Sequence, residues 1–163
     1  MKKELKDILK GKVVIVGIGN VLKGDDGFGP ALIERLNTTG VDATCIDAGT
    51  SLENYFGKIA KEDPDVILIV DAAHLELNPG ECAILESEDI LRSGLTTHDI
   101  SPKMFIDYLK DHTRASVYML GVQPESISLG DEMSATLGRS LGNIAKDMEE
   151  ILNARDTSDR THN

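Results

Sequence analysis

The sequence predicts an α/β protein, in which helices form two layers around a twisted, mostly parallel sheet of about five strands. Apolar runs rich in β-branched residues alternate along the chain with segments whose apolar residues recur at helical spacing. Most connections can hold a crossover helix, which parallel strands require. The turn at 78–80, Asn-Pro-Gly, is too short for one, so the strand after it is predicted to be antiparallel. The expected architecture is a three-layer α/β/α sandwich.

The first half of the chain alternates strand and helix without interruption. Residues 12–19 form an apolar run typical of a strand buried on both faces, and 30–40 have helical spacing, with a proline at the start and a glycine at the end. A second strand is predicted at 42–47 and a second helix at 51–61, where Thr or Ser can cap the helix. Residues 65–73 predict a third, fully buried strand. We expect 12–19 to be the central strand, between the other two.

The second half continues the pattern and ends in a long helix. A short strand is predicted at 81–86, and 101–112 begin with the Ser-Pro pair typical of a helix start. Residues 115–123 predict the last strand, and 130–152 predict a long amphipathic helix. We therefore expect a single domain at 1–153. Residues 154–163 are polar and are predicted to be a disordered tail.

Composition excludes several classes of function. The 17 basic and 28 acidic residues give a net charge of −11, which disfavours nucleic acid and anionic membranes as partners. No apolar run approaches the roughly 20 residues of a membrane-spanning helix. Cys45 and Cys82 lie in apolar runs, which indicates reduced core thiols. We therefore expect a cytoplasmic protein.

The loop after the first strand, GIGNVLKGDDGFG, combines glycines with two adjacent carboxylates. A dinucleotide-binding loop needs glycine where Leu22 stands, although Asp47 imitates its ribose-binding acid. A phosphate-binding P-loop needs Lys-Ser or Lys-Thr after its last glycine, whereas Gly24 is followed by Asp25 and Asp26, which repel phosphate. A simple Asp-Asp-Gly turn that caps the next helix is the remaining structural interpretation.

Other polar residues favour a metal site over a simple turn. Asp71 ends the third strand, and in a 2-1-3 strand order it faces the same crevice as Asp26. His98 precedes a predicted helix start at the same edge, and His74 is a rival imidazole. Two carboxylates and one imidazole suit a divalent cation and leave coordination positions open. No serine lies in a nucleophile-elbow motif, and no histidine pairs with either cysteine.

Four segments together resemble the hydrogenase maturation endopeptidase family, and within it the branch that serves formate-hydrogenlyase-type [NiFe] hydrogenases. The resemblance covers roughly residues 12–124, and the set of motifs in this order is specific. The segments are GIGNVLKGDDGFGPALIERL, DAGTSLENY, VDAAHLELNPGE and TTHDISP.

The resemblance implies an endopeptidase that removes a short C-terminal extension from the precursor of a [NiFe] hydrogenase large subunit once nickel is loaded. It implies Asp26, Asp71 and His98 as ligands of nickel, which the substrate can supply and other divalent cations can replace. Asp26, Asp47 and Asp71 are the catalytic carboxylates that it implies, with Asp47 linked to substrate recognition. The family often has Asp-Gly-Gly where this chain has Asp-Ala-Gly at 47–49.

The residues alone leave the role of the metal open. It can polarise the scissile carbonyl, activate water, or be the precursor's own nickel. A metal-free pair of carboxylates can also supply acid–base catalysis. Two alternatives to a protease are a non-enzymatic nickel-binding or docking module and, less favoured, a nucleotide-binding oxidoreductase.

Overall fold

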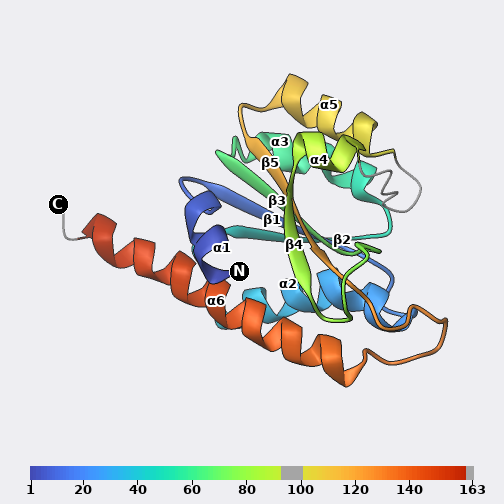
Figure 1. Ribbon diagram of the computed structural model, residues 1–163. Coiled ribbons are helices and arrows are strands. Elements are labelled where there is room, and N and C mark those ends of the chain that lie inside the picture. The colour runs from blue at the N-terminus through green and yellow to red at the C-terminus, as the bar shows by residue number, and fades with distance from the viewer. Residues whose placement is uncertain (93–100, 161–163) are drawn as a thin grey trace.

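The structure, a computed structural model, describes residues 1–92 and 101–160 (Figure 1). Five strands and six α-helices, with two short 3-10 helices (η), follow one another along the described part of the chain. Their order is α1 (Lys2–Ile8), β1 (Val13–Ile18), η1 (Gly24–Gly27), α2 (Phe28–Thr39), β2 (Thr44–Gly49), η2 (Leu52–Tyr55), α3 (Phe56–Lys61), β3 (Val66–Ala72), β4 (Cys82–Glu86), α4 (Ser87–Arg92), α5 (Pro102–His112), β5 (Ser116–Val122) and α6 (Ala135–Arg160).

The strands form one sheet in the order β2-β1-β3-β5-β4. Every neighbouring pair is parallel except β4 and β5, which are antiparallel. The expected fold class and the antiparallel strand at 81–86 are confirmed. The predicted 2-1-3 neighbours are also confirmed, but β3 is the central strand rather than β1. Residues 73–81 connect β3 to β4, but β5 lies between these two strands and pairs with β3 on one side and with β4 on the other.

Helices cover both faces of the sheet, so the molecule has three layers (Figure 1). One apolar core joins alternate residues of β1, β3 and β5 to α1, α2 and α6. The second core joins the intervening residues to α3, α4 and α5. This alternation follows from the period of two along a strand, and it explains why β1 is buried at every position.

The structure adds two helices that the sequence pattern did not predict, α1 and α4. Both are short, with one buried apolar residue apiece, Leu5 and Ile90, too few to show a helical period. The last helix runs past the predicted end at residue 152 as far as Arg160. Arg155 on its extension donates to the carbonyl oxygens of Leu9 and Gly11, which ties α6 to the turn before β1.

Close packing of α2 against the sheet depends on a glycine. A Cβ atom at Gly29 would lie 2.4 Å from the carbonyl oxygen of Ile18 and 2.6 Å from that of Val70. The first turn of α2 therefore rests directly on the ends of β1 and β3. A dinucleotide-binding loop would make this approach through a glycine at Leu22, which here is exposed instead.

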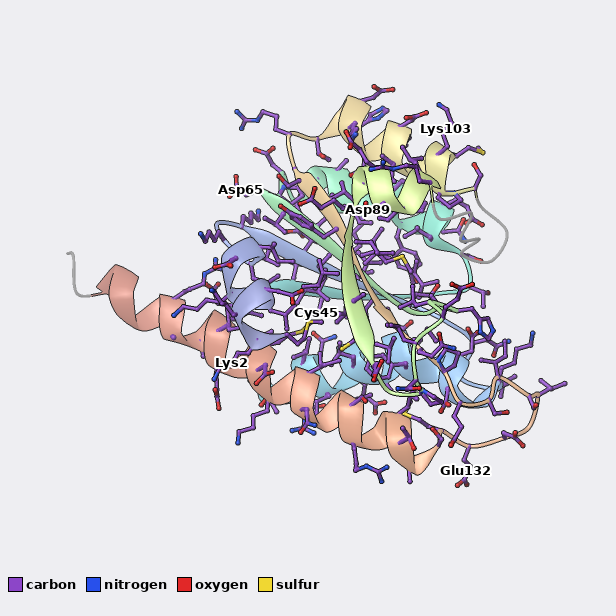
Figure 2. The ribbon with its side chains drawn as sticks, viewed as in Figure 1. Lys2, Cys45, Asp65, Asp89, Lys103 and Glu132 are labelled. Carbon is purple, nitrogen blue, oxygen red and sulfur yellow. The ribbon has the colours of Figure 1, made fainter. Side chains whose placement is uncertain are left out.

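Two further expectations concern membranes and cysteines. Among the described residues, no helix combines the length and apolarity needed to cross a membrane. Cys45 and Cys82 are free and half-buried. Cys45 packs against the core between the sheet and the layer of α1 and α6 (Figure 2). Burial raises its pKa to about 11, so the thiol is protonated at neutral pH.

Candidate active site

The carboxyl ends of β2, β1, β3 and β5 meet at one edge of the sheet, called here the carboxyl edge. Gly17, near the end of β1, pairs with Asp47 of β2 on one side and with Val70 of β3 on the other. Asp71 follows Val70 directly and pairs with Gly121 of β5. The two predicted strand-end carboxylates thus flank the strand from which the glycine-rich loop leaves, as parallel pairing requires.

Asp26 lies in η1, the 3-10 turn that connects this loop to α2. Its Oδ2 accepts a hydrogen bond of 2.9 Å from the backbone N–H of Asn20, and the side chain is half-buried. η1 contacts β3, the strand that carries Asp71. Gly19 allows the tight fold of the loop, because its φ is +152° and a Cβ there would lie 1.8 Å from the Asp26 carbonyl oxygen. The structure therefore places Asp26 and Asp71 on contacting elements.

Asp71 is a carboxylate in an almost fully buried place, with 2% of its surface exposed. It ends a run of six residues of β3, 66–71, that are all buried. Removing a carboxylate from water is costly unless other groups compensate, so a buried carboxylate at a strand end marks a site with a specific requirement for it. Asp71 is therefore more deeply buried than Asp26, which is half-buried.

Asp25 has a different role from its neighbour, and the sequence analysis missed it. It is completely buried, and its carboxylate accepts four hydrogen bonds from the segment between β5 and α6. The backbone N–H groups of Glu125, Ser126 and Ser134 donate at 2.8, 3.2 and 2.7 Å, and the Ser134 hydroxyl donates at 3.0 Å. Asp25 therefore holds two loops together and has no acceptor capacity to spare for a ligand.

Asp47 is the exposed member of the carboxylate set. Its Oδ1 accepts a hydrogen bond of 2.9 Å from the backbone N–H of Gly49, which shapes the turn after β2. The residue lines a cavity of about 300 Å³ at the carboxyl edge. Apolar side chains of Val21, Leu22 and Pro30 form much of the remaining wall. A carboxylate beside an apolar wall suits a ligand side chain with a cationic head and an aliphatic stem.

His74, the rival imidazole, is held by a residue that the sequence analysis did not single out. Gln123 is buried, and its Oε1 accepts a hydrogen bond of 2.7 Å from the backbone N–H of Leu75. This contact turns the Gln123 amide nitrogen toward His74, 3.4 Å from Nδ1. In the tautomer with its proton on Nε2, Nδ1 of His74 accepts this hydrogen bond, so Gln123 orients the imidazole.

The third predicted ligand, His98, lies outside the described residues. The helix that follows it begins as predicted, since the Ser101 hydroxyl accepts a hydrogen bond from the N–H of Met104 and Pro102 is the first helical residue. Within residues 1–92 and 101–160, no group of three acidic, histidine or cysteine side chains is placed to hold a metal ion. The described part of the predicted set is therefore the pair Asp26 and Asp71.

Comparison with known proteins gives one consistent family. A family model described as hydrogenase maturation protease (HycI) matches residues 30–154. The hydrogenase 3 maturation protease of Escherichia coli K12 is 33% identical over 138 residues, which cover 83% of this chain and 88% of that protein. These matches agree with the resemblance seen in the four sequence segments.

Solved structures agree with the sequence matches. The crystal structure of a [NiFe] hydrogenase maturation protease HycI from Thermococcus kodakarensis superposes with a TM-score of 0.85 at 33% identity, covering 92% of this chain and 99% of that one. The solution structure of the endopeptidase HycI from Escherichia coli gives a TM-score of 0.76 at 31% identity, with coverages of 86% and 90%. Likeness therefore extends over nearly the whole fold.

Proposed function

The chain belongs to the hydrogenase maturation protease family and is an endopeptidase, and we propose that it removes the C-terminal extension of a [NiFe] hydrogenase large-subunit precursor after nickel loading. The observation that carries the proposal is the pair Asp26 and Asp71 on contacting elements of the carboxyl edge, in a chain with this family's sequence and fold. Family membership decides against the nucleotide-binding oxidoreductase.

Asp26, Asp71 and His98 are the residues that would bind the nickel. Fit is supported by the chemistry of the two described carboxylates, because oxygen and imidazole donors suit nickel and other divalent cations. Bound there, the cation would supply a Lewis acid beside the scissile peptide. The buried position of Asp71 keeps bulk water from one side of the site, and the N–H of Asn20 fixes one oxygen of Asp26.

We assign the nickel to the precursor rather than to the protease. Three protein ligands leave a cation coordinatively open, so a metal already held by the precursor can accept them. The net charge of −11 attracts a cationic, metal-bearing target and repels acidic proteins. The protease would thus test whether loading is complete before cleaving. Its free thiols support a cytoplasmic place of action.

Asp47 recognises the peptide rather than the metal in this proposal. It is exposed, and it lines the cavity of about 300 Å³ beside the glycine-rich loop. A basic residue near the scissile bond would form a charge-assisted hydrogen bond with it. We expect Asp47→Asn to raise KM for the precursor about tenfold without changing metal affinity. If Asp47→Asn has the same KM and the same metal affinity as the wild type, Asp47 does not take part in substrate recognition.

The decisive experiment compares nickel-loaded and nickel-free precursor, each with and without a chelator, followed by mass spectrometry. We expect the loaded precursor to be cut once and the nickel-free precursor to stay intact. Efficient cleavage of nickel-free precursor in the chelator would leave metal-free carboxylate catalysis as the mechanism. Binding of the loaded precursor without any cleavage would instead identify a nickel-docking module.

A further inference from the structure

Several large apolar side chains of the described residues are exposed to solvent, and four of them lie in two loops of the carboxyl edge. Val21 and Leu22, in the loop after β1, are 65% and 64% exposed. Ile127 and Leu129, in the segment after β5, are 41% and 72% exposed. These four residues are called here the apolar rim. In Figure 1 the segment after β5 extends past the N-terminal end of α2.

Backbone hydrogen bonds join the two loops that carry the apolar rim. The N–H of Gly130 donates to the Leu22 carbonyl oxygen at 2.8 Å, and the N–H of Gly24 donates to that of Asp131 at 3.1 Å. The N–H of Asp25 donates to the Ser126 carbonyl oxygen at 2.9 Å. Leu129 is therefore fixed beside the loop of Val21 and Leu22.

The buried carboxylate of Asp25 also joins the loop after β1 to the segment after β5. Four donors of the segment after β5 converge on this one buried side chain. Charge-assisted hydrogen bonds of this kind hold the loops in a single arrangement while their apolar side chains remain in water. Exposed apolar side chains gathered on joined loops indicate an interaction site, and a surface that is already ordered loses little entropy on binding.

The apolar rim continues into the cavity that contains Asp47. Val21 and Leu22 line that cavity as well as contributing to the rim. Asp26 follows four residues after Leu22 on the same loop. Val21 and Leu22 therefore lie beside Asp47 in the cavity and on the segment that leads to Asp26.

We propose that the apolar rim binds apolar residues of the precursor beside the cleaved bond, so that it sets affinity for the peptide independently of the nickel. This proposal rests on the proposed function. The occupant is the precursor rather than a second copy of this chain, because two copies would each bring a net charge of −11 to the contact. On this proposal the precursor needs apolar residues that contact the apolar rim as well as a basic residue that contacts Asp47.

The test is the double variant Leu22→Ser with Leu129→Ser, assayed with nickel-loaded precursor. Both side chains are exposed, so the melting temperature should stay unchanged. We expect KM and Kd for the precursor to rise about tenfold or more, with kcat unchanged, as when apolar anchors of an interface are truncated. Leu91→Ser on α4 is the matched control, since Leu91 is exposed but outside the rim, and it should leave both constants unchanged.

Each result has a distinct meaning. If the wild-type chain cleaves the precursor and the double variant has unchanged Kd and KM, the rim proposal is wrong. The proposed function would remain intact. A wild-type chain that neither binds nor cleaves loaded precursor would overturn the proposed function and the rim's occupant with it. A wild-type dimer in sedimentation equilibrium that the double variant abolishes would assign the rim to self-association instead.

Discussion

The two edges of the parallel sheet differ in how they hold charge. At the carboxyl edge, Asp25 and Asp71 are buried, and Asp25 bonds to backbone N–H groups at 2.7–3.2 Å. At the opposite, amino edge, several charges form longer ion pairs, such as Lys12 with the half-buried Glu62 at 3.6 Å and Arg155 with Asp42 at 3.9 Å. Figure 2 shows Lys2 and Asp65 toward the amino edge and Glu132 in the loop of the carboxyl edge.

The volumes of the cavities at the two edges do not parallel this difference in charge. Among the described residues, two cavities lined in part by Arg155 lie toward the amino edge, with volumes of about 700 Å³ and about 500 Å³. The cavity beside Asp47 has only about 300 Å³. Burial of a carboxylate costs free energy; four hydrogen bonds to Asp25 offset that cost, so among the buried carboxylates Asp71 is the candidate for chemistry. We therefore propose that the chemistry occurs at the carboxyl edge, although larger cavities lie at the amino edge.

The largest expected effect is on activity at the carboxyl edge. Asp71→Asn and His98→Ala should each lower the rate of precursor processing by about a thousandfold, since each would remove one of the proposed metal ligands. The melting temperature of His98→Ala should be close to that of the wild type. Asp42→Asn at the amino edge is the control and should process normally. Cleavage assays that find equal loss in Asp42→Asn would remove the distinction between the edges.

The next effect is on stability. Asp25→Asn turns one acceptor oxygen into a donor that faces N–H groups, so it should lower the free energy of unfolding by about 3 kcal/mol. Lys12→Ala at the amino edge, which removes an exposed ion pair, should cost about 0.5 kcal/mol or less. Urea unfolding measures both. Similar losses in the two variants would contradict the difference in charge environment.

A smaller effect is expected at the end of α6. Arg155→Ala leaves the carbonyl oxygens of Leu9 and Gly11 without this donor, so unfolding should become easier by about 1 kcal/mol. Processing should be unchanged, because these contacts lie at the amino edge. A chain ending at residue 153 should behave in the same way, which keeps the polar segment 154–163 dispensable for activity. Lost activity with an unchanged melting temperature would give that segment a function.

The smallest effect at neutral pH concerns Cys45 in β2. Because burial raises its pKa to about 11, alkylation by iodoacetamide at pH 8 should be about a hundredfold slower in the folded chain than in urea. Below pH 9 the thiol is protonated in both the folded and the unfolded chain, so its ionisation does not change the free energy of unfolding. Stability should fall as pH rises from 9 toward 11. Peptide mass spectrometry that finds fast alkylation of the folded chain would contradict the burial of this thiol.

The sequence by itself determined the parts of the fold that depend on local pattern. Apolar runs such as 65–73 identify buried strands because both faces of a central parallel strand need apolar residues. Strand ends then indicate where Asp71 and Asp47 lie, since parallel strands place their carboxyl ends at one edge. The prediction that Asp26 lies near Asp71 followed from the same rule, together with the family resemblance, and the two residues lie on contacting elements. His98 remains a prediction from sequence.

Only the tertiary structure decided which of two adjacent aspartates is structural. Asp25 bonds to Ser134, 109 residues away, and no local pattern contains such a contact. Gln123 likewise fixes His74 from a distance of 49 residues, and α1 becomes a helix by packing on α6. Short-range periodicity reports which face of an element is buried, whereas these features depend on which distant donor, acceptor or apolar surface the fold brings into contact.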